Sequence, residues 1–189
     1  PSMGLERPIA GQLLITAFAT RGPLSAYDEF VEIYNPTRKN LTVDGVAVEY
    51  QTASCGGWQS RLLIPPGTVL APGQFFLAAN LRGYVAPASG LIPDGELSTS
   101  GFADSAQLRL KNSTGIALDA VAFGSGHTCF AEGQPVAAQQ NVGGSIARGP
   151  VSYSPGSPAI DTGNNFADFL QMGTRSPRSR SSVSEPSGD

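Results

Sequence analysis

Short runs of alternating apolar and polar residues, separated by turn residues, dominate the chain. Residues 29–34 show the pattern clearly, with Val31 and Ile33 on one face and Glu32 on the other. A period of two places successive side chains on opposite faces of a β-strand. Similar runs predict further strands at 9–19, 41–50, 60–65, 74–80, 144–148 and 167–172.

Residues 105–124 predict a β-hairpin around the turn sequence KNSTG. No segment shows a convincing helical period. Short strands at regular spacing with turn signals between them are typical of a β-sandwich. We therefore expect an all-β sandwich fold with irregular Gly/Pro-rich loops and extended termini.

Composition supports this fold class and one main domain. The 189 residues include 23 Gly and 15 Pro, and only 14% are charged, against about 25% in an average globular protein. We expect an N-terminal extension at 1–8, a sandwich domain at 9–172 and a low-complexity Ser/Arg/Pro tail at 173–189. The tail has too little apolar content to fold alone.

The charge balance limits the classes of partner. A net charge of −3 argues against nucleic acid as the partner of the whole domain, since that association relies on basic surface. No apolar run approaches the ~20 residues of a membrane-spanning helix, so we expect no transmembrane segment.

Cys55 and Cys129 are the two cysteines, and both lie in Gly-rich stretches that resemble loops. A disulfide is the preferred interpretation, with two free thiols as the alternative, and it would imply an oxidising, extracytoplasmic compartment. His127 is the only histidine. Neither a zinc tetrahedron nor a nucleophile–base pair with an orienting group can be assembled around it, so we expect no catalytic residues and no enzyme activity.

Two groups of oxygen-bearing side chains suggest a calcium site, because Ca²⁺ takes six to eight oxygen ligands. The first group lies at the start of the predicted strand at 29–34, and the second precedes the last predicted strand. The candidate ligands are Asp28, Glu29 and Glu32 in the first group, and Asp161, Asn164, Asn165 and Asp168 in the second.

A structural role explains the same residues and is the interpretation we prefer. Asp28 and Glu29 would accept hydrogen bonds from free backbone N–H groups at a strand start. Glu32 would lie on the solvent side, opposite an arginine such as Arg38 or Arg109. The second group would consist of turn formers that bond their own backbone. We therefore expect no cofactor, with calcium as the one alternative.

The chain resembles the lamin-tail domain family in its bacterial and archaeal form. The segments that carry the resemblance are LLITAFAT, DEFVEIYNPTRKNLTVDG, IPPGTVLAPGQFFLAAN, AQLRLKNSTGIALDAVAFG and DTGNNFADF, in this order. The resemblance covers about residues 10–172. It implies an immunoglobulin-like β-sandwich that serves as a binding or structural module, often in secreted or cell-surface proteins.

We therefore expect a non-enzymatic interaction or scaffold module, a subunit or accessory protein of an extracytoplasmic or cell-surface assembly, with protein partners. Two alternatives remain. One is a targeting module of a secreted hydrolase or nuclease that binds polysaccharide or nucleic acid, and the other is a calcium-stabilised adhesin-like domain.

Low-charge loops at 81–105 and 126–160 are the expected contact surfaces. Interfaces favour aromatic anchors, and the loop aromatics are Trp58, Tyr84, Phe130 and Tyr153. The tail adds a basic cluster of Arg175, Arg178 and Arg180. This arm is either a solvated tail or a segment that lies against a partner protein.

Overall fold

The chain folds into a β-sandwich in the computed structural model, which describes residues 5–87, 89–98, 100–129, 132–149 and 159–185. Two large sheets and one two-stranded sheet make up the regular structure of these residues. The helix in this part is the single turn α1 (Asn165–Asp168). The predicted all-β class is confirmed.

The larger sheet has six strands in the order β12-β11-β1-β2-β7-β8. Its neighbours pair antiparallel, except that β8 runs parallel to β7. Its strands are β1 (Leu14–Ala19), β2 (Phe30–Tyr34), β7 (Phe75–Ala79), β8 (Gly95–Glu96), β11 (Ser145–Arg148) and β12 (Phe169–Met172).

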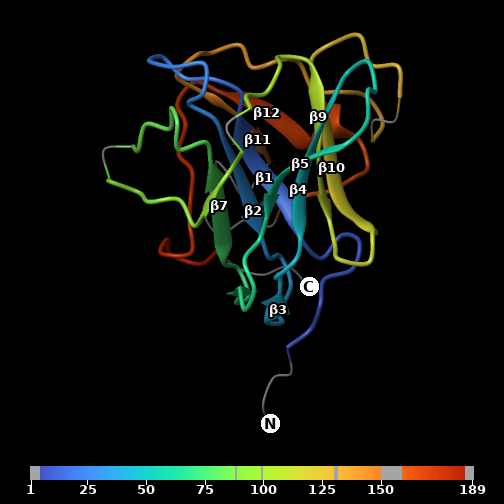
Figure 1. Cartoon of the computed structure of the whole chain (residues 1–189), viewed down its shortest axis with the longest axis vertical. Coiled ribbons are helices and arrows are strands. Elements are labelled where there is room, and N and C mark those ends of the chain that lie inside the picture. Colours follow the sequence, from blue (N-terminus) through green and yellow to red (C-terminus); the bar gives the residue numbers. More distant parts are fainter. Residues whose placement is uncertain (1–4, 88, 99, 130–131, 150–158, 186–189) are drawn as a thin grey trace.

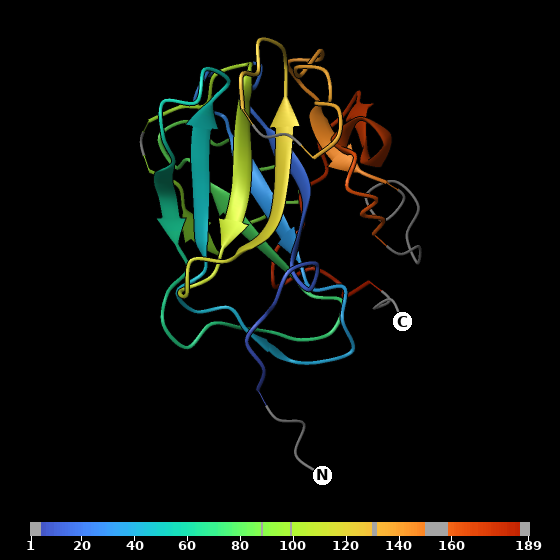
Figure 2. The same ribbon diagram turned by 90° about the vertical axis from the view of Figure 1, so that its right-hand side faces the viewer.

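The second sheet has four antiparallel strands in the order β10-β9-β4-β5 and faces the viewer in Figure 2. They are β4 (Ala47–Thr52), β5 (Gln59–Leu63), β9 (Ala106–Lys111) and β10 (Ala117–Phe123). β9 and β10 form the predicted hairpin. The third sheet pairs β3 (Leu41–Thr42) with β6 (Val69–Leu70).

The single strand predicted at 41–50 is wrong, because β3 and β4 are separate strands. Gly45 lies between them with a φ of +73°. This left-handed conformation costs glycine little, and it turns the chain from the small sheet into the four-stranded one.

The main hydrophobic core lies between the two large sheets, where their inner faces meet. Alternate residues of the facing strands supply it, as the period of two requires. Members include Ile15, Val31, Ile33, Phe76, Val48, Tyr50, Leu108, Leu110, Val121 and Phe123, all of them buried.

The six-stranded sheet is buried on its outer face as well. That face carries a second apolar cluster, consisting of Ala17, Ala19, Phe30, Leu77, Ala79 and Ala147. Tyr84, Leu91 and Met172 pack against it. The C-terminal segment 173–185 continues this cover, and its red trace descends beside β7 in Figure 1. Every residue of β2 is therefore buried.

Candidate functional site

A fully buried arginine, Arg148, ends β11 and organises a polar cluster. Its Nε donates to the carbonyl of Ile15 at 2.9 Å, and its Nη2 lies 2.9 Å from both carboxylate oxygens of Asp119. Its Nη1 donates to the carbonyl of Ile160 at 3.1 Å. The guanidinium carbon lies 4.5 Å from the centroid of the Phe169 ring. Arg148 thus joins strands from both large sheets to the segment that precedes β12.

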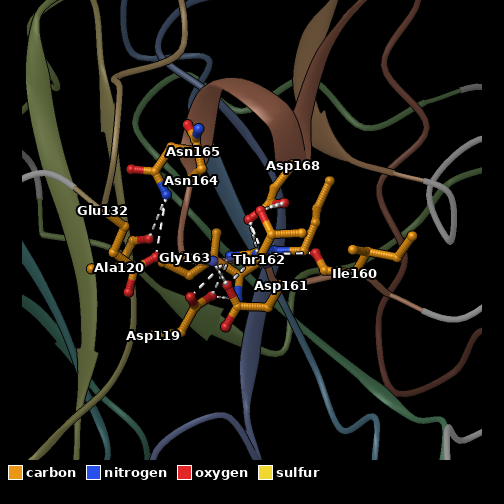
Figure 3. Close-up of polar contacts among 12 residues, drawn as sticks. Asp119, Ala120, Glu132, Ile160, Asp161, Thr162, Gly163, Asn164, Asn165 and Asp168 are labelled. Carbon is orange, nitrogen blue, oxygen red and sulfur yellow. Dashed lines mark hydrogen bonds and ion pairs between the residues drawn. The ribbon is translucent and has the colours of Figure 1, made fainter.

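Two further carboxylates approach the same guanidinium. Nη1 lies 3.3 Å from Asp161 and 3.4 Å from Asp168. Asp168 also accepts hydrogen bonds from the backbone N–H of Thr162 at 3.0 Å and from its hydroxyl at 2.7 Å, as Figure 3 shows. The segment 160–168 is therefore held by Arg148 from one side and by its own aspartate from the other.

Glu132 adds a fourth carboxylate to this region. One oxygen each of Asp119, Glu132 and Asp161 lie within 4.8 Å of one another. Burial, together with the negative charges of Asp119 and Asp161, raises the pKa of Glu132 to about 7. Burial also raises the pKa of Asp119 to about 6, although Arg148 opposes the shift. The cluster therefore retains protons that isolated carboxyl groups would have released by neutral pH.

Asn164 and Asn165, predicted as cation ligands, use their side chains within the fold. The Asn165 carbonyl oxygen accepts from the N–H of Ala122 at 2.9 Å. Its amide donates to the carbonyl of Ala120 at 3.1 Å (Figure 3). Asn164 accepts from the N–H of Gln134 at 3.2 Å. These amides tie the 160–168 segment to β10 and to the loop before β11.

Chemically, the arrangement can hold protons or one hard cation at Asp119, Glu132 and Asp161. A guanidinium already supplies positive charge there, since both oxygens of Asp119 bind Arg148. The geometry therefore fits a structural clamp better than a dedicated calcium cage, which needs six to eight oxygens.

The carboxylates of the first predicted calcium group also form hydrogen bonds within the domain. Asp28 accepts hydrogen bonds from the N–H of Val85 at 2.9 Å and from Nη1 of Arg175 at 2.7 Å. Glu29 accepts from the N–H of Phe102 and from Nδ2 of Asn80, the latter at 3.0 Å. The expected bonding of Asp28 and Glu29 to free backbone N–H groups is confirmed, with donors in other loops.

The predicted solvent-facing position of Glu32 is wrong. Its exposure is 0%, because segment 173–185 covers this face of the sheet. Glu32 binds Thr16 Oγ1 at 2.7 Å, and the backbone N–H and Nη2 of Arg178 at 2.6 and 2.8 Å. Arg109, which we considered as its partner, instead pairs with Glu49 at 2.6 Å.

Segment 173–185 therefore lies against its own domain and is not a solvated arm. The Arg178 guanidinium also lies 3.9 Å from the centroid of the Phe75 ring. The backbone of Arg180 is anchored by Asp94 and Gln74, at 2.9 and 3.0 Å. The arginines predicted to bind a partner thus have binding sites on their own domain.

The predicted disulfide is present. Cys55 and Cys129 are bonded, with their Cα atoms 6.0 Å apart and their positions 74 apart in the sequence. The bond joins the loop after β4 to the loop after β10, so it links two strands of the four-stranded sheet.

The aromatic residues predicted as anchors have different environments. Trp58 is half-buried, with the guanidinium of Arg109 4.0 Å above its ring. Tyr84 packs against the outer apolar cluster, and burial raises the pKa of its phenol to about 12. Phe130 and Tyr153 lie outside the described residues.

Sequence reasoning missed the residues at the centre of the cluster, namely Arg148, Asp119 and Glu132. A signal existed for the first two. Asp119 interrupts the apolar run ALDAVAF, and Arg148 ends the apolar strand SIAR. A charge inside an apolar strand indicates a buried ion pair, because an isolated buried charge is costly.

In comparisons with known proteins, no protein-family model matches the sequence, and no curated protein matches it. Among the described residues, none of the helical structure has the length and apolar character that crossing a bilayer requires.

Proposed function

We propose that the protein is a non-enzymatic interaction or scaffold module, working as a subunit or accessory protein of an extracytoplasmic assembly. The lamin-tail resemblance described above favours this function, and the immunoglobulin-like form of the sandwich is part of the same proposal. The Cys55–Cys129 bond supports the location, because disulfides persist in oxidising compartments.

One surface feature carries the proposal. Pro23, Leu24, Val85, Ala86 and Pro87, here called the loop patch, line a pocket of about 310 Å³ beside Asp28 and Arg175. Leu24 is 80% exposed and Val85 42% exposed. Adjacent exposed aliphatic side chains around a depression are typical of protein contact sites.

The rigidity of this pocket supports the same function. Val85 donates its N–H to Asp28, which Arg175 holds in turn. Leu24 and Val85 therefore project from loops that are fixed by a buried ion pair. A preorganised apolar surface loses little conformational entropy on binding, which favours a protein partner.

The test compares two surface variants in co-purification from the source. Leu24→Glu places a charge in the loop patch, and Ile116→Glu does the same at the exposed turn between β9 and β10, where Ile116 is 52% exposed. We expect Leu24→Glu to lose the partner and Ile116→Glu to keep it. Equal retention by both variants would overturn the assignment of the loop patch.

A further inference from the structure

A second feature lies at the edge of the four-stranded sheet, away from the loop patch and the Arg148 cluster. In the register of β4 and β5, Val48 pairs with Leu62 and Glu49 pairs with Ser60. Arg61 therefore has no partner on β4 and forms a β-bulge. A bulge redirects the side chain of the extra residue, and Arg61 is only 8% exposed although both its neighbours in the sequence are more exposed.

The guanidinium of Arg61 has few contacts for a buried charge. Its carbon lies 4.5 Å from the centroid of the Tyr50 ring, and Nη1 lies 3.5 Å from the hydroxyl of Ser98. Its Nε has no hydrogen-bond partner among the described residues. No carboxylate of the described part of the protein forms an ion pair with it.

Glu29 is the carboxylate that acts on Arg61 electrostatically. Both oxygens of Glu29 already accept hydrogen bonds, from Phe102 and from Asn80. Arg61 therefore differs from Arg148, Arg175 and Arg178, each of which contacts a carboxylate directly. A buried cation without a contacting anion is costly unless a further group satisfies it.

Arg61 is one of the residues that line an open groove of about 380 Å³, within the range of small-ligand sites. The groove lies between β5, an edge strand, and residues 96–98, at the end of β8 and directly after it. The hydroxyls of Ser60 and Ser98 supply donors, and leucine side chains supply an apolar wall. The leucines are Leu62, Leu63 and Leu97.

These features select one class of ligand. A guanidinium that contacts no carboxylate and lies near hydroxyls favours an anion with planar oxygens, because arginine binds carboxylates through parallel N–H groups. Glu96 also lines the groove and is exposed. Its negative charge disfavours multiply charged anions such as phosphate and leaves a single carboxylate as the best match.

We propose that the groove at Arg61 binds a peptide carboxylate, from an acidic side group or a free C-terminus, with adjacent apolar residues against the leucine wall. This inference shares one assumption with the proposed function, namely that the partner is a protein. It concerns a different surface from the loop patch, so either can fail alone.

The experiment follows the Nε–Hε signal of Arg61 by ¹H–¹⁵N NMR in the whole protein. The probes are acetyl-Ala-Leu-Glu-Leu-Ala-amide, its glutamine counterpart, and acetyl-Ala-Leu-Ala with a free C-terminal carboxylate. We expect a saturable shift with one or both carboxylate peptides. The glutamine peptide should bind at least about tenfold more weakly than its glutamate counterpart. The responding peptide identifies the source of the carboxylate.

Two variants complete the test. Arg61→Met should fold with equal or higher Tm, because it removes an uncompensated buried charge, and should lose peptide binding. Arg109→Met, on the outer face of the same sheet, should retain binding. The proposal is overturned if neither carboxylate peptide gives a saturable shift, if the glutamine peptide binds equally well, or if Arg61→Met still binds. If Arg61→Met does not fold, the comparison of peptides on the natural protein decides.

Discussion

The guanidinium of Arg178 binds the carboxylate of Glu32 at the centre of β2, although the two residues are 146 positions apart in the sequence. Glu32 is fully buried and the Arg178 side chain is only 17% exposed. The C-terminal segment therefore belongs to the folded domain, and the outer face of the six-stranded sheet depends on it for both apolar cover and charge balance.

Removing the arginine should destabilise the whole domain. Arg178→Ala leaves Glu32 buried with Thr16 as its remaining side-chain hydrogen-bond donor, so we expect a loss of about 3 kcal/mol in the free energy of unfolding. Arg180→Ala is the matched control, because the contacts of Arg180 to Asp94 and Gln74 use its backbone. It should change stability by less than about 0.5 kcal/mol. Equal effects in urea titrations would contradict the pairing.

Arg148 should have a larger effect than Arg178. Arg148→Met would leave Asp119 fully buried, with its charge opposed by no contacting cation. We expect a loss of about 4 kcal/mol at pH 7, measured by chemical denaturation. The double variant Arg148→Met/Asp119→Asn should recover part of this loss, since it removes both charges. Failure of the second change to recover any stability would mean that Arg148 acts through packing alone.

The cluster also predicts how stability depends on pH. Asp119 and Glu132 have pKa values raised to about 6 and about 7, so between about pH 4 and pH 7 the folded state holds protons that the unfolded state has released. Their contribution to stability is therefore present at acidic pH and is lost as the pH rises through this window.

Glu132→Gln isolates this effect. The variant should match the natural protein near pH 4 and exceed its Tm at pH 8 by about 3 °C, corresponding to roughly 1 kcal/mol. Glu49→Gln is the opposite control. Burial alone would raise the pKa of Glu49, but Lys111 and Arg109 hold it below its usual value, so this variant should lose stability at pH 8. A lower Tm for Glu132→Gln at pH 8 would contradict the account.

Calcium should contribute little to stability. The carboxylates of both predicted calcium groups contact arginines or backbone and amide donors, so few oxygens remain for a cation. We expect millimolar CaCl₂ and excess EDTA to give Tm values within about 1 °C of each other. A saturable rise in Tm with calcium, abolished by Glu132→Gln, would show that Asp119, Glu132 and Asp161 hold the ion.

Most of the longer strands were predictable from sequence because their alternation is local, whereas the two-residue strands β6 and β8 were not predicted. The disulfide was predictable from two cysteines in loop-like stretches. The burial of the second face of β2 could not be predicted from the strand itself. The residues that cover this face are far away in the sequence, namely Tyr84, Leu91, Met172 and residues 173–185. The alternation in β2 looks the same whether Glu32 faces water or Arg178.

The partners of the charged residues were likewise unpredictable, because they depend on contacts far apart in sequence. Asp119 meets Arg148 only after β10, β11 and β1 have come together. Arg61 is directed inward by a one-residue shift in the β4–β5 register. The local sequence QSRLL contains no signal for this shift. Local patterns determine which residues form strands, and packing between strands determines which charges are buried.

Native mass spectrometry of the protein purified gently from its source tests the interaction-module function most directly. The account predicts a complex heavier than one copy of the protein, containing at least one other protein, that dissociates when Leu24→Glu replaces the natural sequence. A mass equal to one bare copy under the same conditions would contradict it.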